Sequence, residues 1–257
     1  MSLAPPLAAF LGVIGVGYWV MCSSYSQLLG RFPYRGGDPG TPGNTAKRIA
    51  LTFDDGPNEP FTTEIADFLA EHGIRATFFQ VGACVERFPE VSRRLLADGH
   101  VIGNHSATHT LARCWGRRAE RAETDAAQAA LTRVLRREPA LYRPPWLLRT
   151  PSLFGILRQR GLVPISGTFC HAFEVFQPAP ARIARRALAK CRSGAIIIFH
   201  DGFDARGGNR ASTVEAVKLV VLESIRRGFE FVTVDELLGI PAYQQSGVMA
   251  QSNPSTT

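Results

Sequence analysis

Two hydrophobic patterns alternate along this chain of 257 residues. Uninterrupted apolar runs such as ATFFQV (76–81) and AIIIF (195–199) predict strands that are covered on both faces, as in a parallel sheet. The segments between such runs have apolar residues every three or four positions, which predicts amphipathic helices. Because strands and helices alternate from residue 49 to residue 232, the pattern predicts an α/β fold with a parallel sheet covered by helices.

The apolar runs also place the individual elements. Strands are predicted at residues 49–53, 76–81, 101–103, 141–143, 162–165, 195–199 and 229–232. Helices are predicted at residues 62–71, 90–97, 118–137, 151–160, 181–190 and 213–227. About seven such repeats favour a closed or nearly closed barrel over an open doubly wound sheet.

The two ends of the chain differ from this central region. Residues 3–22 carry no charge and are long enough to cross a bilayer as one helix, although a buried core helix fits the same composition. We therefore expect a membrane anchor or uncleaved signal over residues 1–24, a linker over 25–47 that contains GGDPGTPGN (36–44), and the main domain over 48–240. The composition of residues 241–257 predicts a disordered tail.

An N-terminal anchor raises the question of which side of the membrane carries the main domain. We predict a membrane-anchored protein whose main domain lies outside the cytoplasm. The basic residues that follow the apolar segment favour the alternative, a domain on the cytoplasmic face, and they are Arg31, Arg35, Lys47 and Arg48.

Charge and cysteine content narrow the partners. The formal net charge of +7 suits an anionic membrane surface, an anionic cell-wall polymer or nucleic acid. No basic stretch is interleaved with aromatic residues, so we expect no nucleic-acid partner. We also expect a monomer. The first strand is followed by neither GxGxxG nor GxxxxGK[ST], which disfavours dinucleotide and P-loop chemistry.

Four cysteines lie outside the apolar segment, and their spacing matches no zinc site and fits either two disulfides or free thiols.

Reactive side chains follow several of the predicted strands. They are Asp54 and Asp55 after the first strand, His105 and His109 after the third, Arg143 at the end of the fourth, and His200 after the sixth. Since the carboxyl ends of barrel strands form one rim, we expect these side chains to meet there.

Three of these residues have the side chains and spacing of a metal-ligand set. His105 and His109 have the HxxxH spacing, and Asp55 offers a carboxylate on the same rim. Two imidazoles and one carboxylate form a three-ligand set with an open position, as in a catalytic zinc site. A divalent cation would neutralise Asp55 and leave Asp54 as a base beside a polarised water. His200 would then lie on the opposite side, placed to protonate a leaving group.

Four motifs in this order resemble those of the polysaccharide deacetylases of carbohydrate esterase family four, the NodB-homology fold: TFDDGP (52–57), HSATH (105–109), RPPW (143–146) and IFHD (198–201). The resemblance covers residues 49–238. It implies a distorted (β/α) barrel of seven or eight parallel strands. It also implies metal-dependent removal of an N-acetyl group from a sugar.

The resemblance assigns roles to the matching residues. It implies three catalytic residues, which are the general base Asp54, its hydrogen-bond partner Arg143 and the general acid His200. It implies three ligands for zinc, cobalt or another divalent ion, which are Asp55, His105 and His109. It implies three substrate-binding residues, which are Pro145, Trp146 as one wall of the site, and Ile198 in a small apolar pocket for the acetyl methyl.

Two departures from the family pattern touch the substrate groove. The family usually has an Asp-Trp motif whose aspartate orients the catalytic histidine, but this chain reads SGTFCHAFEVFQ (166–177), where Glu174 and His171 are the candidates. Leu147 stands where the family usually has glycine. The expected function is metal-dependent removal of N-acetyl groups from a peptidoglycan or chitin-like glycan. Because of the two departures, a lipid-linked amino sugar that is deacetylated or deformylated is the alternative substrate. A non-catalytic glycan-binding module on the same fold is the remaining alternative.

Overall fold

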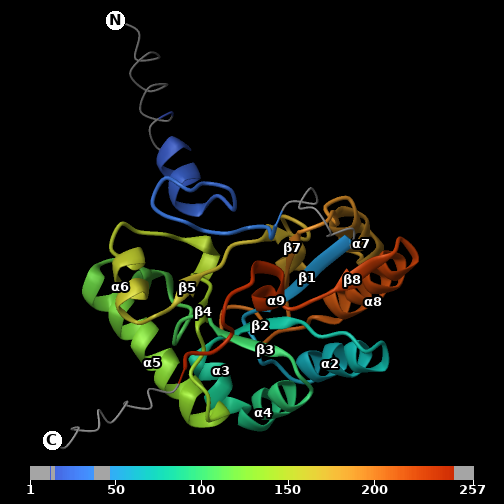
Figure 1. Ribbon diagram of the computed structural model, residues 1–257, viewed down its shortest axis with the longest axis horizontal. Coiled ribbons are helices and arrows are strands. Elements are labelled where there is room, and N and C mark those ends of the chain that lie inside the picture. Colours follow the sequence, from blue (N-terminus) through green and yellow to red (C-terminus); the bar gives the residue numbers. More distant parts are fainter. Residues whose placement is uncertain (1–11, 13–14, 38–46, 246–257) are drawn as a thin grey trace, which may run out of the picture.

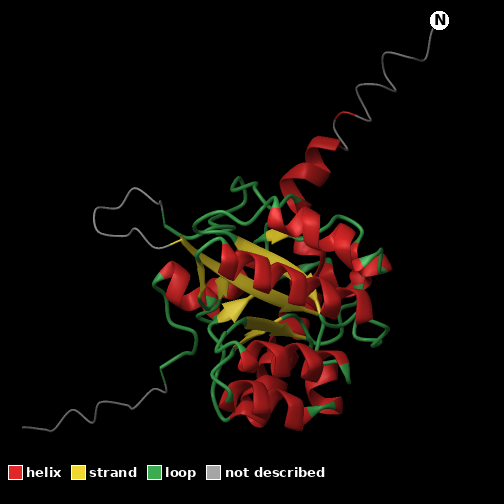
Figure 2. Ribbon diagram, turned by 90° about the vertical axis from the view of Figure 1, so that its right-hand side faces the viewer, coloured by secondary structure: helices red, strands yellow, loops and turns green. Residues whose placement is uncertain are grey.

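The computed structural model describes residues 12, 15–37 and 47–245. A parallel sheet forms its centre (Figure 1), with strands β1 (Lys47–Asp54), β2 (Thr77–Gln80), β3 (Val101–Asn104), β4 (Leu141–Tyr142), β5 (Val163–Pro164), β6 (Thr168–Phe169), β7 (Ile196–His200) and β8 (Phe229–Phe231). The α-helices are α2 (Phe61–Glu71), α3 (Gly82–Arg87), α4 (Pro89–Ala97), α5 (Arg117–Leu135), α6 (Leu153–Gln159), α7 (Pro180–Leu188), α8 (Ala211–Arg226) and α9 (Val234–Leu238). Short 3₁₀ helices are η1 (Leu111–Cys114), η2 (Pro145–Leu147) and η3 (Glu174–Phe176). Figure 2 shows the helices packed around the strands.

The order of the strands explains why the sheet curls. Neighbouring strands follow the order β5-β4-β3-β2-β1-β7-β6, and β8 pairs with the first residues of β1. Only residues 165–167 separate the two edge strands β5 and β6 in the sequence. The two edges of the sheet must therefore come close to each other, which leaves a seam between β5 and β6. This architecture confirms the predicted distorted barrel of seven or eight parallel strands.

The two faces of the central strand β1 carry different side chains, one in the hydrophobic core and the other inside the barrel. Alternate residues of a strand point to opposite faces. Phe53 stacks between Phe78 of β2 and Phe199 of β7, with ring centroids 4.9 and 5.9 Å apart, in the core beneath the helices. Thr52 and Asp54 have the opposite orientation, so β1 delivers polar side chains to the inside of the barrel.

The prediction of a membrane-anchored protein is contradicted. Within residues 12, 15–37 and 47–245, none of the helices has the length and apolar character needed to cross a bilayer. A crossing requires about 20 apolar residues in one helix, whereas the helical stretch at residues 15–22 ends in a turn. The rest of the predicted anchor lies outside the described residues.

The predicted linker and tail also differ from the structure. Phe32, in the predicted linker, is fully buried. Tyr243, in the predicted tail, pairs with Pro139 in an antiparallel bridge and accepts a hydrogen bond at its hydroxyl from the Ile102 N–H (3.1 Å). The packed domain therefore extends beyond both predicted boundaries, while residues 38–46 and 246–257 lie outside the described residues.

Of the two alternatives for the cysteines, disulfides or free thiols, the structure shows the second, because all five cysteines are free thiols.

Candidate active site

The strand register brings the predicted reactive residues to one rim. Asp54, the last residue of β1, is the register partner of His200, the last residue of β7. His105 directly follows β3, and Arg143 directly follows β4, its neighbour. The Arg143 N–H donates to the carbonyl of Asn104, the last residue of β3 (2.9 Å). Residues that are far apart in sequence thus lie at the carboxyl ends of adjacent strands.

Asp55, His105 and His109 converge as a possible metal-binding set. Their candidate ligand atoms all lie within 4.8 Å of one another. Asp55 Oδ1 is 3.3 Å from His105 Nε2 and 3.1 Å from His109 Nε2. The three residues are at most 6% exposed. Asp55 and His109 both have positive φ angles, of 75° and 50°, which lie in the left-handed region that few residues other than glycine adopt.

The hydrogen bonds behind these residues fit a cation between them. His105 Nδ1 lies 2.6 Å from the Arg143 carbonyl. A carbonyl only accepts, so Nδ1 carries the proton and the lone pair of Nε2 faces Asp55 Oδ1. Asp55 Oδ1 is itself buried without a hydrogen-bond partner. Two acceptors that face each other in a buried site require a positive charge between them, and a divalent cation supplies it.

The charge of Asp55 supports the same conclusion. Burial by itself opposes ionisation of this carboxyl, but positive charge at His109, His105 and His200 outweighs burial and holds the pKa of Asp55 below its ordinary value. A cation bound to the unprotonated imidazole nitrogens would supply that positive charge in their place. Asp55 is therefore an anion at neutral pH and is available as a ligand.

Arg143 holds the carboxylate of Asp54. The guanidinium is fully buried, and its Nη1 donates to Asp54 Oδ1 and to Thr52 Oγ1, at 2.7 Å each. Its Nη2 donates to the Ser166 carbonyl (3.0 Å). An arginine bound at several points presents its charge in a fixed direction, so Asp54 keeps one orientation beside the ligand set.

Glu174 pairs with His200. His200 Nδ1 lies 2.7 Å from Glu174 Oε2, and the other carboxylate oxygen accepts a hydrogen bond from the Thr213 hydroxyl. Burial opposes the charged imidazolium, but Glu174 outweighs it and raises the pKa of His200 to about 9. His171, the other candidate, instead accepts a hydrogen bond from the Phe173 N–H (3.0 Å). The structure therefore makes Glu174, and not His171, the hydrogen-bond partner of His200.

Comparison with known proteins gives this site a family. The sequence profile described as Polysaccharide deacetylase matches residues 42–165. The peptidoglycan-N-acetylglucosamine deacetylase of Bacillus cereus is 32% identical over 197 residues, which cover 76% of this chain and 90% of that protein. The chain belongs to the polysaccharide deacetylase family. The chitooligosaccharide deacetylase of Bradyrhizobium sp. is 31% identical over 199 residues, covering 74% of this chain and 90% of that protein.

Solved structures show the same fold. The Bc1960 peptidoglycan N-acetylglucosamine deacetylase superposes with a TM-score of 0.73 at 24% identity, covering 82% of this chain and 94% of that chain. BA3943 of Bacillus anthracis, described as a CE4 family pseudoenzyme, superposes with a TM-score of 0.70 at 21% identity, covering 80% and 68%. At these identities the likeness shows the fold alone. Since this fold also occurs in a pseudoenzyme, the activity of a polysaccharide deacetylase family member must be argued from its own residues.

In this family member, a cavity of about 260 Å³ opens over the ligand set. Trp146 forms one wall, with its ring centroid 4.3 Å from that of His109. Leu147 lines the cavity, but Pro145 and Ile198, both predicted to bind substrate, are not among its lining residues. Ile198 is fully buried and packs with Leu147 in one apolar cluster. Leu147 is therefore the fully buried member of this cluster that faces the cavity, beside Phe169, a partly buried ring that packs against the same cluster.

Asp204 is a site residue that the sequence did not reveal. Its Oδ1 lies 3.0 Å from His109 Nδ1, and its main-chain N–H donates to Asp55 Oδ2 (3.3 Å). It therefore contacts two of the three candidate ligands, as carboxylates behind metal-binding histidines commonly do. Asp204 lies in a loop after β7 that matches no motif, so only the folded loop brings it to the site.

Proposed function

We propose that this chain is a metal-dependent deacetylase that removes N-acetyl groups from the amino sugars of a glycan, with peptidoglycan or a chitin-like oligosaccharide as substrate. The observation that carries the proposal is the position of Asp54. Its carboxylate is bound by buried Arg143 at 2.7 Å, directly precedes the candidate ligand Asp55, and lies opposite His200 in the sheet. A base, an acid and a ligand set on one cavity rim support amide hydrolysis.

Asp55, His105 and His109 would hold the metal. Two imidazoles and a carboxylate suit zinc, and cobalt or another divalent ion is compatible with the same donors. When bound, such an ion polarises the acetyl carbonyl and acidifies a water molecule. The buried, unpaired Asp55 Oδ1 and the proton on His105 Nδ1 support this assignment.

The chain's own residues would carry the proton transfers. Asp54 accepts a proton from the attacking water as the water oxygen bonds to the acetyl carbon. The main-chain N–H of Trp146 would stabilise the resulting oxyanion. His200, whose Nδ1 proton is bound by Glu174, then donates its Nε2 proton to the sugar nitrogen while the carbon–nitrogen bond breaks. The products are acetate and a free amine.

A glycan substrate is supported by the surface next to the cavity. A second hollow of about 530 Å³ shares His109, Trp146 and Asp204 with the catalytic cavity. Its other lining residues lie at 108, 110–112 and 205–206. Neighbouring sugar units of an oligosaccharide would occupy this hollow while one N-acetyl group enters the cavity. The names of the Bacillus and Bradyrhizobium relatives support the same substrate class.

A non-catalytic glycan-binding module is the competing candidate, because BA3943, which has the same fold, is described as a pseudoenzyme. The ion pairs that hold the proposed base and the proposed acid favour the enzyme. Binding alone requires neither the Asp54–Arg143 pair nor the His200–Glu174 pair.

Acetate release by the full chain tests the proposal. We would supply N-acetylglucosamine oligomers and peptidoglycan fragments, with chelator and with zinc added back. Asp54→Asn should lower turnover by about 10²–10⁴-fold and keep bound metal, while Asp125→Asn, a matched change in a surface ion pair on α5, should leave turnover unchanged. If the wild type binds metal and glycan but releases no acetate, the binding module replaces the enzyme.

A further inference from the structure

The N-terminal segment, residues 20–36, lies along the seam between β5 and β6. Ser166, between those strands, donates its main-chain N–H to the Pro33 carbonyl and its hydroxyl to the Ser24 carbonyl, both at 2.8 Å. Gly36 donates to the Gly194 carbonyl (2.7 Å) just before β7. In Figure 1 this segment, in blue, runs above β5 towards β7. The segment therefore covers the seam of the barrel.

Arg149 binds the N-terminal segment to the loop that carries the cavity wall. Its side chain is nearly fully buried at 1% exposure and donates to four main-chain carbonyls at 2.7–3.3 Å, those of Val20, Met21, Ser23 and Ser26. Arg149 lies two residues after Leu147. A buried guanidinium needs its donors satisfied, so the segment and this loop are fixed relative to each other.

Phe32 is the apolar anchor of the segment. Its ring is fully buried and forms one cluster with Leu147 and Ile198. The Arg149 guanidinium carbon lies 4.5 Å from the ring centroid. The Gln27 side chain accepts from the Phe32 N–H (2.6 Å) and donates to the Phe32 carbonyl (2.8 Å). Both the backbone and the ring of Phe32 are thus held in place.

Leu147 connects the cluster around Phe32 to the cavity, which Phe169 at the edge of this cluster also lines. It lines the cavity, whereas Phe32 and Ile198 do not. Its φ of 54° lies in the left-handed region that favours glycine, and a leucine keeps such a conformation only where its surroundings hold it. The Phe32 ring supplies such packing behind Leu147. The leucine that departs from the family pattern and the buried phenylalanine therefore form one unit.

We propose that Phe32 is a specificity-determining residue that supports Leu147 as the rear wall of the acyl pocket and so limits the length of the acyl group. The inference rests on the proposed deacetylase function. A shorter side chain at position 32 leaves space into which Leu147 moves, and the pocket then accepts a longer acyl chain. Phe32 acts through Leu147 and touches no reacting atom.

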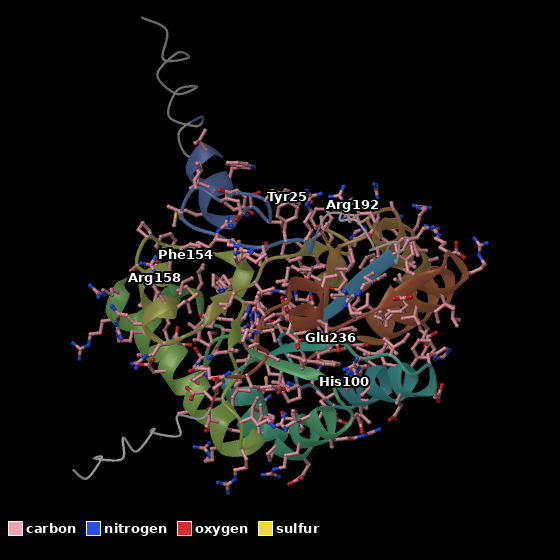
Figure 3. All side chains as sticks on the ribbon, viewed as in Figure 1. Tyr25, His100, Phe154, Arg158, Arg192 and Glu236 are labelled. Carbon is pink, nitrogen blue, oxygen red and sulfur yellow. The ribbon has the colours of Figure 1, made fainter. Side chains whose placement is uncertain are left out.

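Acyl preference tests this role. For the full chain with metal bound, kcat/KM would be measured on chitooligosaccharides carrying N-acetyl or N-propionyl groups. Phe32→Ala should raise the propionyl-to-acetyl ratio about tenfold, the scale of one methylene in an apolar pocket. The matched control is Phe154→Ala. Phe154, labelled in Figure 3, packs against the same cluster from α6. It lines a separate cavity of about 380 Å³, which residues 29–31 and 33 also line, so its loss should leave the ratio unchanged.

A second measurement separates this inference from the proposed function. The affinities of acetate, propionate and butyrate for the cobalt-loaded full chain would be read from the cobalt absorption spectrum. Phe32→Ala should raise butyrate affinity relative to acetate about tenfold, even if the wild type hydrolyses no N-acyl sugar. If Phe32→Ala leaves the propionyl-to-acetyl ratio of kcat/KM or the butyrate-to-acetate ratio of affinities unchanged, the role of Phe32 is overturned. If no turnover is found but the ratio of carboxylate affinities changes, only the deacetylase function is overturned. If Phe32→Ala fails to fold, Phe32→Leu should show a smaller shift in the same direction, and no shift overturns the proposal.

Discussion

His200 Nδ1 lies 2.7 Å from Glu174 Oε2, although the two residues come from different elements. Glu174 begins η3, and His200 ends β7. The glutamate is 1% exposed, so its charge acts on the imidazole through little solvent. This pair involves one of the two candidates, Glu174 and His171, that the sequence offered in place of the aspartate of the family pattern.

Replacing this glutamate should change the pH dependence of turnover. Glu174 outweighs the effect of burial and raises the pKa of His200 to about 9. A general acid works only while it is protonated, so the alkaline limb of kcat should lie near that pH in the wild type. Glu174→Gln removes the negative charge and should move the alkaline limb to lower pH by about one unit or more. The pH profile of acetate release measures this shift.

His171→Gln is the matched control for that experiment. His171 was the other candidate partner, and it makes its hydrogen bond to the Phe173 N–H instead. Its replacement should leave the alkaline limb in place. A shift with His171→Gln and none with Glu174→Gln would reverse the assignment.

Removal of Asp55 should abolish stabilisation by metal. A ligand that binds only the folded state stabilises it by about 2.7 kcal/mol when its concentration is 100 times Kd, so added zinc should raise the wild-type Tm by several degrees. Asp55→Ala removes the carboxylate whose Oδ1 is buried without a partner. Thermal unfolding of this variant with and without zinc should give one Tm. Asp54→Asn, next to it, should retain the zinc effect, and equal loss in both variants would contradict the ligand assignment.

Asp204 should tune metal affinity without being a ligand. It lies 3.0 Å from His109 Nδ1 and donates its N–H to Asp55. Loss of such an outer carboxylate typically weakens metal binding about 10–100-fold, and we expect that range for Asp204→Asn. Competition with a chromophoric chelator measures it. Asp67→Asn, in an exposed ion pair with Arg94, should leave affinity unchanged; a complete loss of binding in Asp204→Asn would make Asp204 a direct ligand.

Arg149 should contribute strongly to stability. Arg149→Met leaves four main-chain carbonyls without their charged donor, so the free energy of unfolding should fall by about 2 kcal/mol or more. Urea denaturation measures the change, and proteolysis within residues 20–36 should become faster. Arg158→Met, on the exposed face of α6 near Phe154 (Figure 3), should have little effect on either. An unchanged unfolding free energy in Arg149→Met would show that the four hydrogen bonds of Arg149 add nothing to stability.

The hydrophobic pattern located the long elements well. The predicted strands at 49–53, 76–81 and 195–199 differ from β1, β2 and β7 by at most two residues at either end. Strand β6 and helices α3 and α9 were not predicted, because two to six residues are too few to show a period. The linker and tail were predicted from composition. Composition does not reveal that Phe32 or Tyr243 has a place in the packed domain.

The sequence by itself determined that strands and helices alternate along the chain, and which residues lie at the strand ends. It thereby named Asp54, Asp55, His105, His109 and His200, because parallel strands end at one rim whatever loops join them. Only the tertiary structure chose Glu174 over His171, brought Asp204 to His109 and placed Phe32 behind Leu147. These contacts join loops and segments whose paths follow no period. Their positions depend on packing between distant parts of the chain, which no local pattern records.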